Sequence, residues 1–161
     1  MAYENKNALH NANLKAILNE IVDGINAAGG TRLLSNPTLA IGTTKSKIKH
    51  NAFDIMKDGV VSTINTGEVA FTATTDDLED GTGAIYLVYL DGSTVKILKG
   101  TATSGGTDAV CPATPAGKVK LGEVKIVNSS GALFDATTTL LDASGLTVTY
   151  TNKIDVVEGI A

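Results

Sequence analysis

The chain has 161 residues, of which 43% are apolar and 19% are charged, so its composition is that of a folded protein and not of a disordered segment. The formal net charge of −4 argues against general nucleic-acid binding, and a single cysteine excludes an internal disulfide framework. The charge is uneven, because residues 1–60 hold seven Lys and Arg against five Asp and Glu, whereas residues 61–161 hold six against twelve.

The amino-terminal part of the sequence predicts one long helix over residues 7–28. Its apolar residues recur at spacings of four, three and four, which places them on one face of a helix. The glycines at residues 29–30 end the predicted helix. No later segment has a comparable helical period, so we expect this stripe to pack either on the following β-domain or on copies of itself. The residues of the stripe are Leu14, Leu18, Ile21 and Ile25.

From residue 31 onward the apolar period changes to two, which is typical of strands. Turn sequences such as Asp58-Gly59 and Ser144-Gly145 separate the apolar runs. The clearest predicted hairpin joins residues 85–90 to residues 94–98 through Asp91-Gly92. The expected strands span residues 31–34, 38–41, 45–50, 60–65, 68–74, 84–90, 94–98, 119–127, 137–141 and 146–151.

The expected fold class is therefore mainly β. We predict an antiparallel β-sandwich or jelly-roll-like domain over residues 31–161, preceded by one long N-terminal α-helix. Residues 1–30 are interpreted as an arm and helix for assembly or attachment. The first residues lack an apolar run, and no segment reaches the roughly 20 apolar residues of a membrane span, so we expect no signal peptide, no membrane contact and synthesis in the cytoplasm.

An acidic segment over residues 75–83 is the first candidate binding site. Its carboxylates could serve as calcium ligands, but their spacing does not match an EF-hand. We favour the alternative, a solvated turn between strands. The carboxylates are Asp76, Asp77, Glu79 and Asp80.

Catalytic patterns are scarce in the sequence. With only His10 and His50, a histidine metal site or a Ser-His-Asp triad has few candidates. Residues 104–107 are glycine-rich, but neither a Lys-Ser/Thr pair nor a helical pattern follows them, so we expect a flexible loop and not a phosphate site. Cys111 is interpreted as a small buried apolar residue, with a reactive thiol as the alternative. We therefore expect no enzyme and no cofactor.

Three lysines alternate along one expected strand. Because alternate residues of a strand share a face, Lys45, Lys47 and Lys49 should project together. One interpretation is a basic strip that docks on an acidic protein surface. The other is an edge strand that its lysines keep soluble.

The later part of the chain carries a series of short motifs. A Leu-Gly pair at residues 121–122 and a strand are followed by Gly131-Ala-Leu-Phe134, by Thr-Thr-Thr-Leu at residues 137–140, and by Gly145-Leu-Thr-Val-Thr-Tyr150. With the upstream hairpin Tyr86-Leu-Val-Tyr-Leu-Asp-Gly92, this series is similar to small virion proteins of tailed bacteriophages. These include capsid decoration (cement) and head-fibre-like proteins, and the resemblance covers about residues 50–152.

This resemblance implies a β-sandwich, often trimeric, that sits on capsid subunits and has no catalytic residues. We therefore expect a capsid decoration protein on the virion surface, with the major capsid protein and further copies of itself as partners. One alternative is a tail-associated or receptor-binding module that contacts host glycans, and another is a metal-dependent or carbohydrate-active enzyme on a jelly roll. The expected interface residues are Leu14, Leu18, Ile21, Ile25, Lys45, Lys47 and Lys49.

Overall fold

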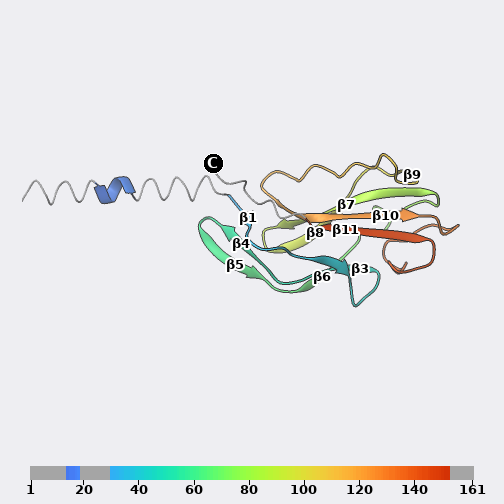
Figure 1. Cartoon of the computed structure of the whole chain (residues 1–161), viewed down its shortest axis with the longest axis horizontal. Helices are drawn as coiled ribbons and strands as arrows, with labels where there is room; N and C mark the ends of the chain where they lie inside the picture. The colour runs from blue at the N-terminus through green and yellow to red at the C-terminus, as the bar shows by residue number, and fades with distance from the viewer. Residues whose placement is uncertain (1–13, 19–29, 153–161) are drawn as a thin grey trace, which may run out of the picture.

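The computed structural model describes residues 14–18 and 30–152 (Figure 1). Residues 14–18 are α-helical. The long helix predicted over residues 7–28 is not confirmed, because the described helix has five residues and the rest of the predicted range lies outside the described residues. Residues 30–152 consist of strands and turns, so the mainly β prediction is confirmed.

The largest sheet consists of β7 (Thr82–Asp91), β8 (Thr94–Lys99), β9 (Thr103–Ser104), β10 (Val119–Asn128) and β11 (Leu146–Asn152). Its order is β11-β10-β7-β8, all pairs are antiparallel, and β9 pairs with the start of β7. The register between β10 and β7 shifts between Lys120 and Gly122, so Leu121 is the extra residue of a β-bulge. The two longest strands, β7 and β10, lie at the centre of this sheet.

Two three-stranded sheets lie on one side of the large sheet (Figure 1). One has the order β1-β4-β5 and the other the order β2-β3-β6. Because β3 pairs with β6 and β4 with β5, the two sheets share one long hairpin, whose tip is the turn Asp58-Gly59. The strands are β1 (Arg32–Leu33), β2 (Leu39–Ile41), β3 (Lys47–His50), β4 (Phe53–Lys57), β5 (Val60–Ile64) and β6 (Gly67–Ala70). Neither β4 nor β9 is among the strands expected from the sequence.

The hydrophobic core lies between the large sheet and the two small ones. Tyr86 and Val88 of β7 and Val124 of β10 are completely buried. Ile48 of β3 and Phe53 of β4 belong to the same buried cluster from the other side. Alternate residues of β3, β4 and most of β10 thus enter the core, which is the physical origin of the period of two in these parts of the sequence.

One predicted strand, over residues 137–141, is a turn. Asp135 Oδ1 accepts hydrogen bonds from the N–H and the hydroxyl of Thr137 at 2.9 and 2.7 Å, and the Asp135 carbonyl accepts one from the Thr139 N–H at 2.9 Å. The hydrogen bond from the Thr137 hydroxyl has the largest effect and that from the Thr137 N–H the next largest, and together they hold the pKa of Asp135 below its ordinary value. The threonines that favoured a strand therefore donate to an Asx-type turn instead.

The predicted hairpin of β7 and β8 is confirmed, with its turn displaced by one residue. Asp91 pairs with Thr94, so the turn is Gly92-Ser93, and Gly92 has a φ of 66°. The Asp91 carboxylate accepts hydrogen bonds from Lys118 and, at 2.6 Å, from Lys96. The ammonium group of Lys118, with the larger effect, and that of Lys96 together lower the pKa of Asp91 to about 2.

Replacing Asp91 with asparagine should destabilise the domain near neutral pH and have little effect in strong acid. The folded-state pKa of about 2 lies below the ordinary value of 3.8, so the ionised carboxylate stabilises the fold above that ordinary value. The contribution is lost as the pH falls from there through the folded-state pKa. Urea unfolding at several pH values measures the difference. Asp108→Asn, at an exposed loop position, is the control, and matching pH profiles for the two variants would contradict the assignment.

Candidate interaction surfaces

The described helical residues carry an exposed apolar stripe. Leu14, Ile17 and Leu18 are spaced i, i+3 and i+4, which places them on one face. Their exposed fractions are 51%, 53% and 53%. Two of the predicted interface residues, Leu14 and Leu18, therefore lie on the surface, whereas Ile21 and Ile25 lie outside the described residues.

The core of the β-domain does not depend on this stripe. Among the described residues, every buried member of the hydrophobic core comes from residues 33–141. The partly buried apolar residues packed against that core also come from the strands and extend to Tyr150. The stripe is thus left available for contact with another polypeptide.

The structure separates the three lysines of the predicted basic strip. Lys47 and Lys49 lie on β3 and share its outer face, while Ile48 between them is completely buried. Lys45 lies in the turn before β3, and its Nζ forms an ion pair with Asp142 Oδ2 at 2.5 Å. The prediction that all three lysines alternate along one strand is therefore wrong for Lys45.

The turn that contains Lys45 is held by the carboxylate of Glu68. Glu68 Oε1 accepts hydrogen bonds from the backbone N–H of Thr43 and, at 3.3 Å, of Thr44. The Lys47 N–H donates to the Thr44 carbonyl at 2.8 Å, so the strand cannot continue backwards past Lys47. Desolvation acts to raise the pKa of Glu68, but the Thr43 and Thr44 donors outweigh it and hold that pKa below its ordinary value.

The acidic segment is bound to the loop that follows β10. Asp80 Oδ1 accepts a hydrogen bond from the Gly131 N–H at 2.8 Å, and Asp77 Oδ1 accepts one from the Ala136 N–H at 2.8 Å. These bonds join residues 51 and 59 positions apart in the chain. The carboxylates thus serve as acceptors that fix one loop against another.

Asp76 is buried, so the interpretation of this segment as a solvated turn is wrong at this residue. Its Oδ2 accepts a hydrogen bond from the Thr72 N–H at 2.6 Å, and its carbonyl accepts one from the Tyr86 hydroxyl at 2.6 Å. Burial raises the pKa of Asp76 against the opposing effects of the Thr72 N–H and Lys99. Burial, and then the charges of Asp76 and Asp77, also raise the pKa of Tyr86. This network secures the fold and leaves Asp76 without access to solvent.

The segment between β9 and β10 arches over β7 on the outer side of the large sheet (Figure 1). Cys111 Sγ lies 3.7 Å from Lys120 Nζ, and Lys120 forms an ion pair with Glu123. Burial, followed by the charge of Glu123, raises the pKa of the Cys111 thiol, so the thiol is a poor nucleophile at neutral pH. Leu87, whose side chain belongs to the same face as Glu123, is completely buried. The segment therefore acts as a cover for this face.

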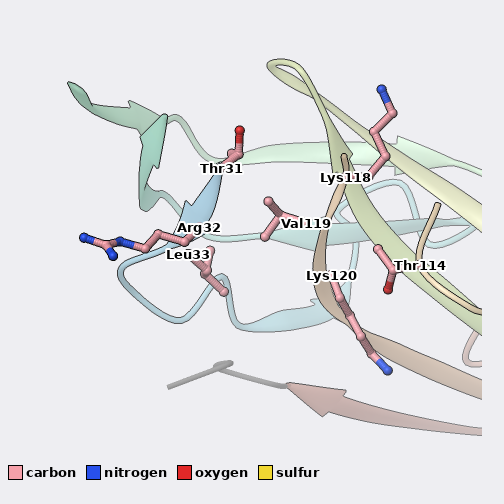
Figure 2. A pocket seen from close by; sticks show the side chains of 7 residues that line it. All are labelled: Thr31, Arg32, Leu33, Thr114, Lys118, Val119 and Lys120. Carbon is pink, nitrogen blue, oxygen red and sulfur yellow. The ribbon is translucent and has the colours of Figure 1, made fainter. Parts of the chain in front are cut away.

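A pocket of about 220 Å³ lies where β1 meets the start of β10. Figure 2 shows three cationic side chains around it, and Arg32, Lys118 and Lys120 extend in different directions. Lys118 already pairs with Asp91, and Lys120 already pairs with Glu123. The cationic groups of Arg32, Lys118 and Lys120 therefore do not converge on one position where an anionic ligand could bind.

No family model, curated protein or solved structure matches this chain. Within residues 14–18 and 30–152, no three His, Cys, Asp or Glu side chains are grouped so that they could hold a metal ion. The same residues include no helix that is long and apolar enough to cross a membrane. Two surface features are candidate interaction sites: the apolar stripe and the lysines of β3.

Proposed function

We propose that this chain is a structural protein of a tailed-bacteriophage virion, a capsid decoration protein that binds the shell and stabilises it. The observation that carries the proposal is the half-exposed stripe of Leu14, Ile17 and Leu18, because the described core of the β-domain is formed without these residues. An apolar stripe of this kind gains stability by contact with another polypeptide. The resemblance of residues 50–152 to small virion proteins suggests what that polypeptide is.

In this proposal the stripe joins copies of the chain into a homo-oligomer, with a trimer preferred. Ile21 and Ile25 continue the spacing of Leu14 and Leu18 in the sequence. An oligomer that seats several copies on a regular shell multiplies individually weak contacts, so each contact to the major capsid protein can be small. The protein then acts by binding alone, without a reaction.

Lys47 and Lys49 supply a second contact, to an acidic surface of the shell. Replacing both with serine should weaken shell binding about threefold to tenfold at low salt and less at high salt, because salt screens exposed charges. Replacing Lys45 alone should have a smaller effect, since its charge is already paired with Asp142. Co-sedimentation of the variants with shells at two salt concentrations gives the dissociation constants.

A matched pair of lysines controls for net charge in this experiment. Lys57→Ser combined with Lys125→Ser removes the same charge from positions outside β3. If this double variant lost as much affinity as the β3 double variant, binding would depend on overall charge, and the assignment of β3 would be wrong.

The test of the proposed function is whether the purified chain binds phage shells that lack it. Saturable binding with a shell that becomes more resistant to heat is the expected result. Absence of binding would instead favour the tail-associated or receptor-binding module, whose target would be a host glycan.

A further inference from the structure

The outer edge of β5 is an exposed strand edge. β5 pairs with β4 on one side, and no described strand pairs with its other side. Val60 and Val61 are 63% and 56% exposed. The sequence of β5 is Val-Val-Ser-Thr-Ile, without a charge or a proline. Soluble proteins usually protect such edges with lysines, prolines or bulges, so an unprotected edge of β-branched residues is suited to pairing with another strand.

The backbone of β5 presents a defined set of hydrogen-bonding groups. Lys57 and Val60 flank the two-residue turn Asp58-Gly59, whose positive φ values of 50° and 77° suit a tight hairpin. Lys57 and Val60 are therefore a hydrogen-bonded pair, and the pattern alternates along the ladder. It follows that the N–H and C=O groups of Val61 and Thr63 point away from β4, towards the free edge.

We propose that β5 pairs with β5 of a second copy of this chain, antiparallel, about a two-fold axis at Ser62. In this register Val61 lies opposite the partner subunit's Thr63, and each such pair exchanges two hydrogen bonds. The two equivalent pairs use all four outward groups of each copy. Val60 lies opposite the partner subunit's Ile64, which gives its exposed side chain an apolar neighbour.

Charge is consistent with this self-pairing. None of the five residues of β5 is charged, so the two-fold axis brings no like charges face to face. An isologous contact needs a surface that complements itself. The sequence Val-Val-Ser-Thr-Ile meets this condition when a second copy runs antiparallel to it. Aliphatic residues then lie opposite each other at both ends, and Ser62 lies opposite its own copy at the centre.

In the proposed register, the hairpin turn of the partner subunit lies next to a groove. The groove has a volume of about 450 Å³ and is lined by residues 63–65 and 93–95 together with His50 and Glu68. With Val60 opposite Ile64, the partner's two-residue turn falls beside Asn65, which is at this groove. The groove leaves room for the turn at the end of the paired strands.

The contact is small, because it involves one five-residue strand from each copy. It falls below the roughly 1,200 Å² that a stable protein interface buries, so we expect weak pairing in dilute solution. Neighbouring copies held on one surface would pair far more completely. The proposal uses neither the helical stripe nor the β3 lysines, and it does not depend on binding to a shell.

A cysteine at the centre of the paired strands tests this register in the full-length chain. The two copies of Ser62 form a non-hydrogen-bonded pair with Cα atoms about 4.5 Å apart, within the range that a disulfide can bridge. Ser62→Cys should therefore give a disulfide-linked dimer under mild oxidation, seen by non-reducing electrophoresis. The unmodified chain, which contains Cys111, sets the background.

Val60→Cys is the matched control, because it is an exposed position on the same strand. In the proposed register the two copies of Val60 are about 13 Å apart along the strands, four residues at roughly 3.3 Å each, and cannot form a disulfide. We expect about tenfold more dimer from Ser62→Cys than from Val60→Cys. Equal yields from the two variants, or a Ser62→Cys yield no higher than background, would overturn the proposal. Shells are absent from the experiment, so either outcome is independent of the proposed function.

Discussion

Replacing Phe134 with alanine should lower the free energy of unfolding of the β-domain by about 3–5 kcal/mol, as expected for a buried aromatic side chain that leaves a cavity. Phe134 is 1% exposed, and its ring packs edge-on against Phe71 with centroids 6.1 Å apart. Its backbone exchanges two hydrogen bonds with Leu78, at 2.9 and 3.1 Å. Phe134 therefore fastens the loop after β10 to the acidic segment, and urea unfolding followed by circular dichroism measures the loss.

The neighbouring residue gives the control for this prediction. Leu133 is 50% exposed, so Leu133→Ala should cost about 0.5 kcal/mol or less. Both substitutions remove a large apolar side chain, and the two adjacent positions differ in burial, 50% exposed against 1%. A larger loss at Leu133 than at Phe134 would contradict the burial of Phe134 in the core.

Replacing Leu14 and Leu18 together with aspartate should weaken self-association at least about a hundredfold and leave the thermal unfolding of the β-domain unchanged. Each leucine contributes about 1.5–3 kcal/mol when it becomes buried at an interface, and burying a carboxylate in its place adds a further cost. The β-domain should keep its stability because neither leucine belongs to its buried core. Sedimentation equilibrium measures association, and differential scanning calorimetry measures unfolding.

Lys15→Asp, in the same described helical segment but off the apolar face, is the control for the added carboxylate. This variant should associate as the unmodified chain does. If the double variant instead unfolded the β-domain, the stripe would pack on its own sheet. If the unmodified chain were monomeric at micromolar concentration, the proposed oligomer would be wrong.

The strands were largely predictable because local patterns determine them. The β7–β8 hairpin follows from an apolar run and a turn that contains Gly92. β4 has a similar local pattern, because the apolar Phe53 and Ile55 are buried, Asp54 between them is less so, and the turn Asp58-Gly59 follows. The strand predicted at residues 137–141 failed for a local reason, since the preceding Asp135 turns the threonines into donors.

The role of the acidic segment could not be predicted because its partners are distant in sequence. Asp80 binds a backbone N–H 51 positions away, and Asp77 binds one 59 positions away. The spacing of residues within the segment does not reveal such distant contacts. A solvated turn and a segment that is hydrogen-bonded to a distant loop therefore have the same sequence pattern. The same limit applies to Lys45, whose ion-pair partner Asp142 is 97 positions away.

The helical stripe illustrates a different limit. The spacing of Leu14 and Leu18 is identical whether the stripe packs on its own sheet or on another chain, so the sequence left both arrangements open. The exposed fractions of Leu14 and Leu18 add that these two residues are not buried on the sheet, whose described core is formed without them. The lysines are similar: alternation gave Lys47 and Lys49 a shared face, but only the Glu68-bound turn reveals that Lys45 leaves the strand.

The proposed binding to a phage shell can be measured in a mixture of purified components. Purified full-length protein is mixed at saturating concentration with shells that lack it, the shells are sedimented, and the bound fraction is then heated until the shells release their DNA. We predict saturable co-sedimentation and a higher release temperature for decorated shells than for bare ones. Shells that bind no protein, or that release their DNA at the same temperature with and without it, would contradict a role in capsid decoration.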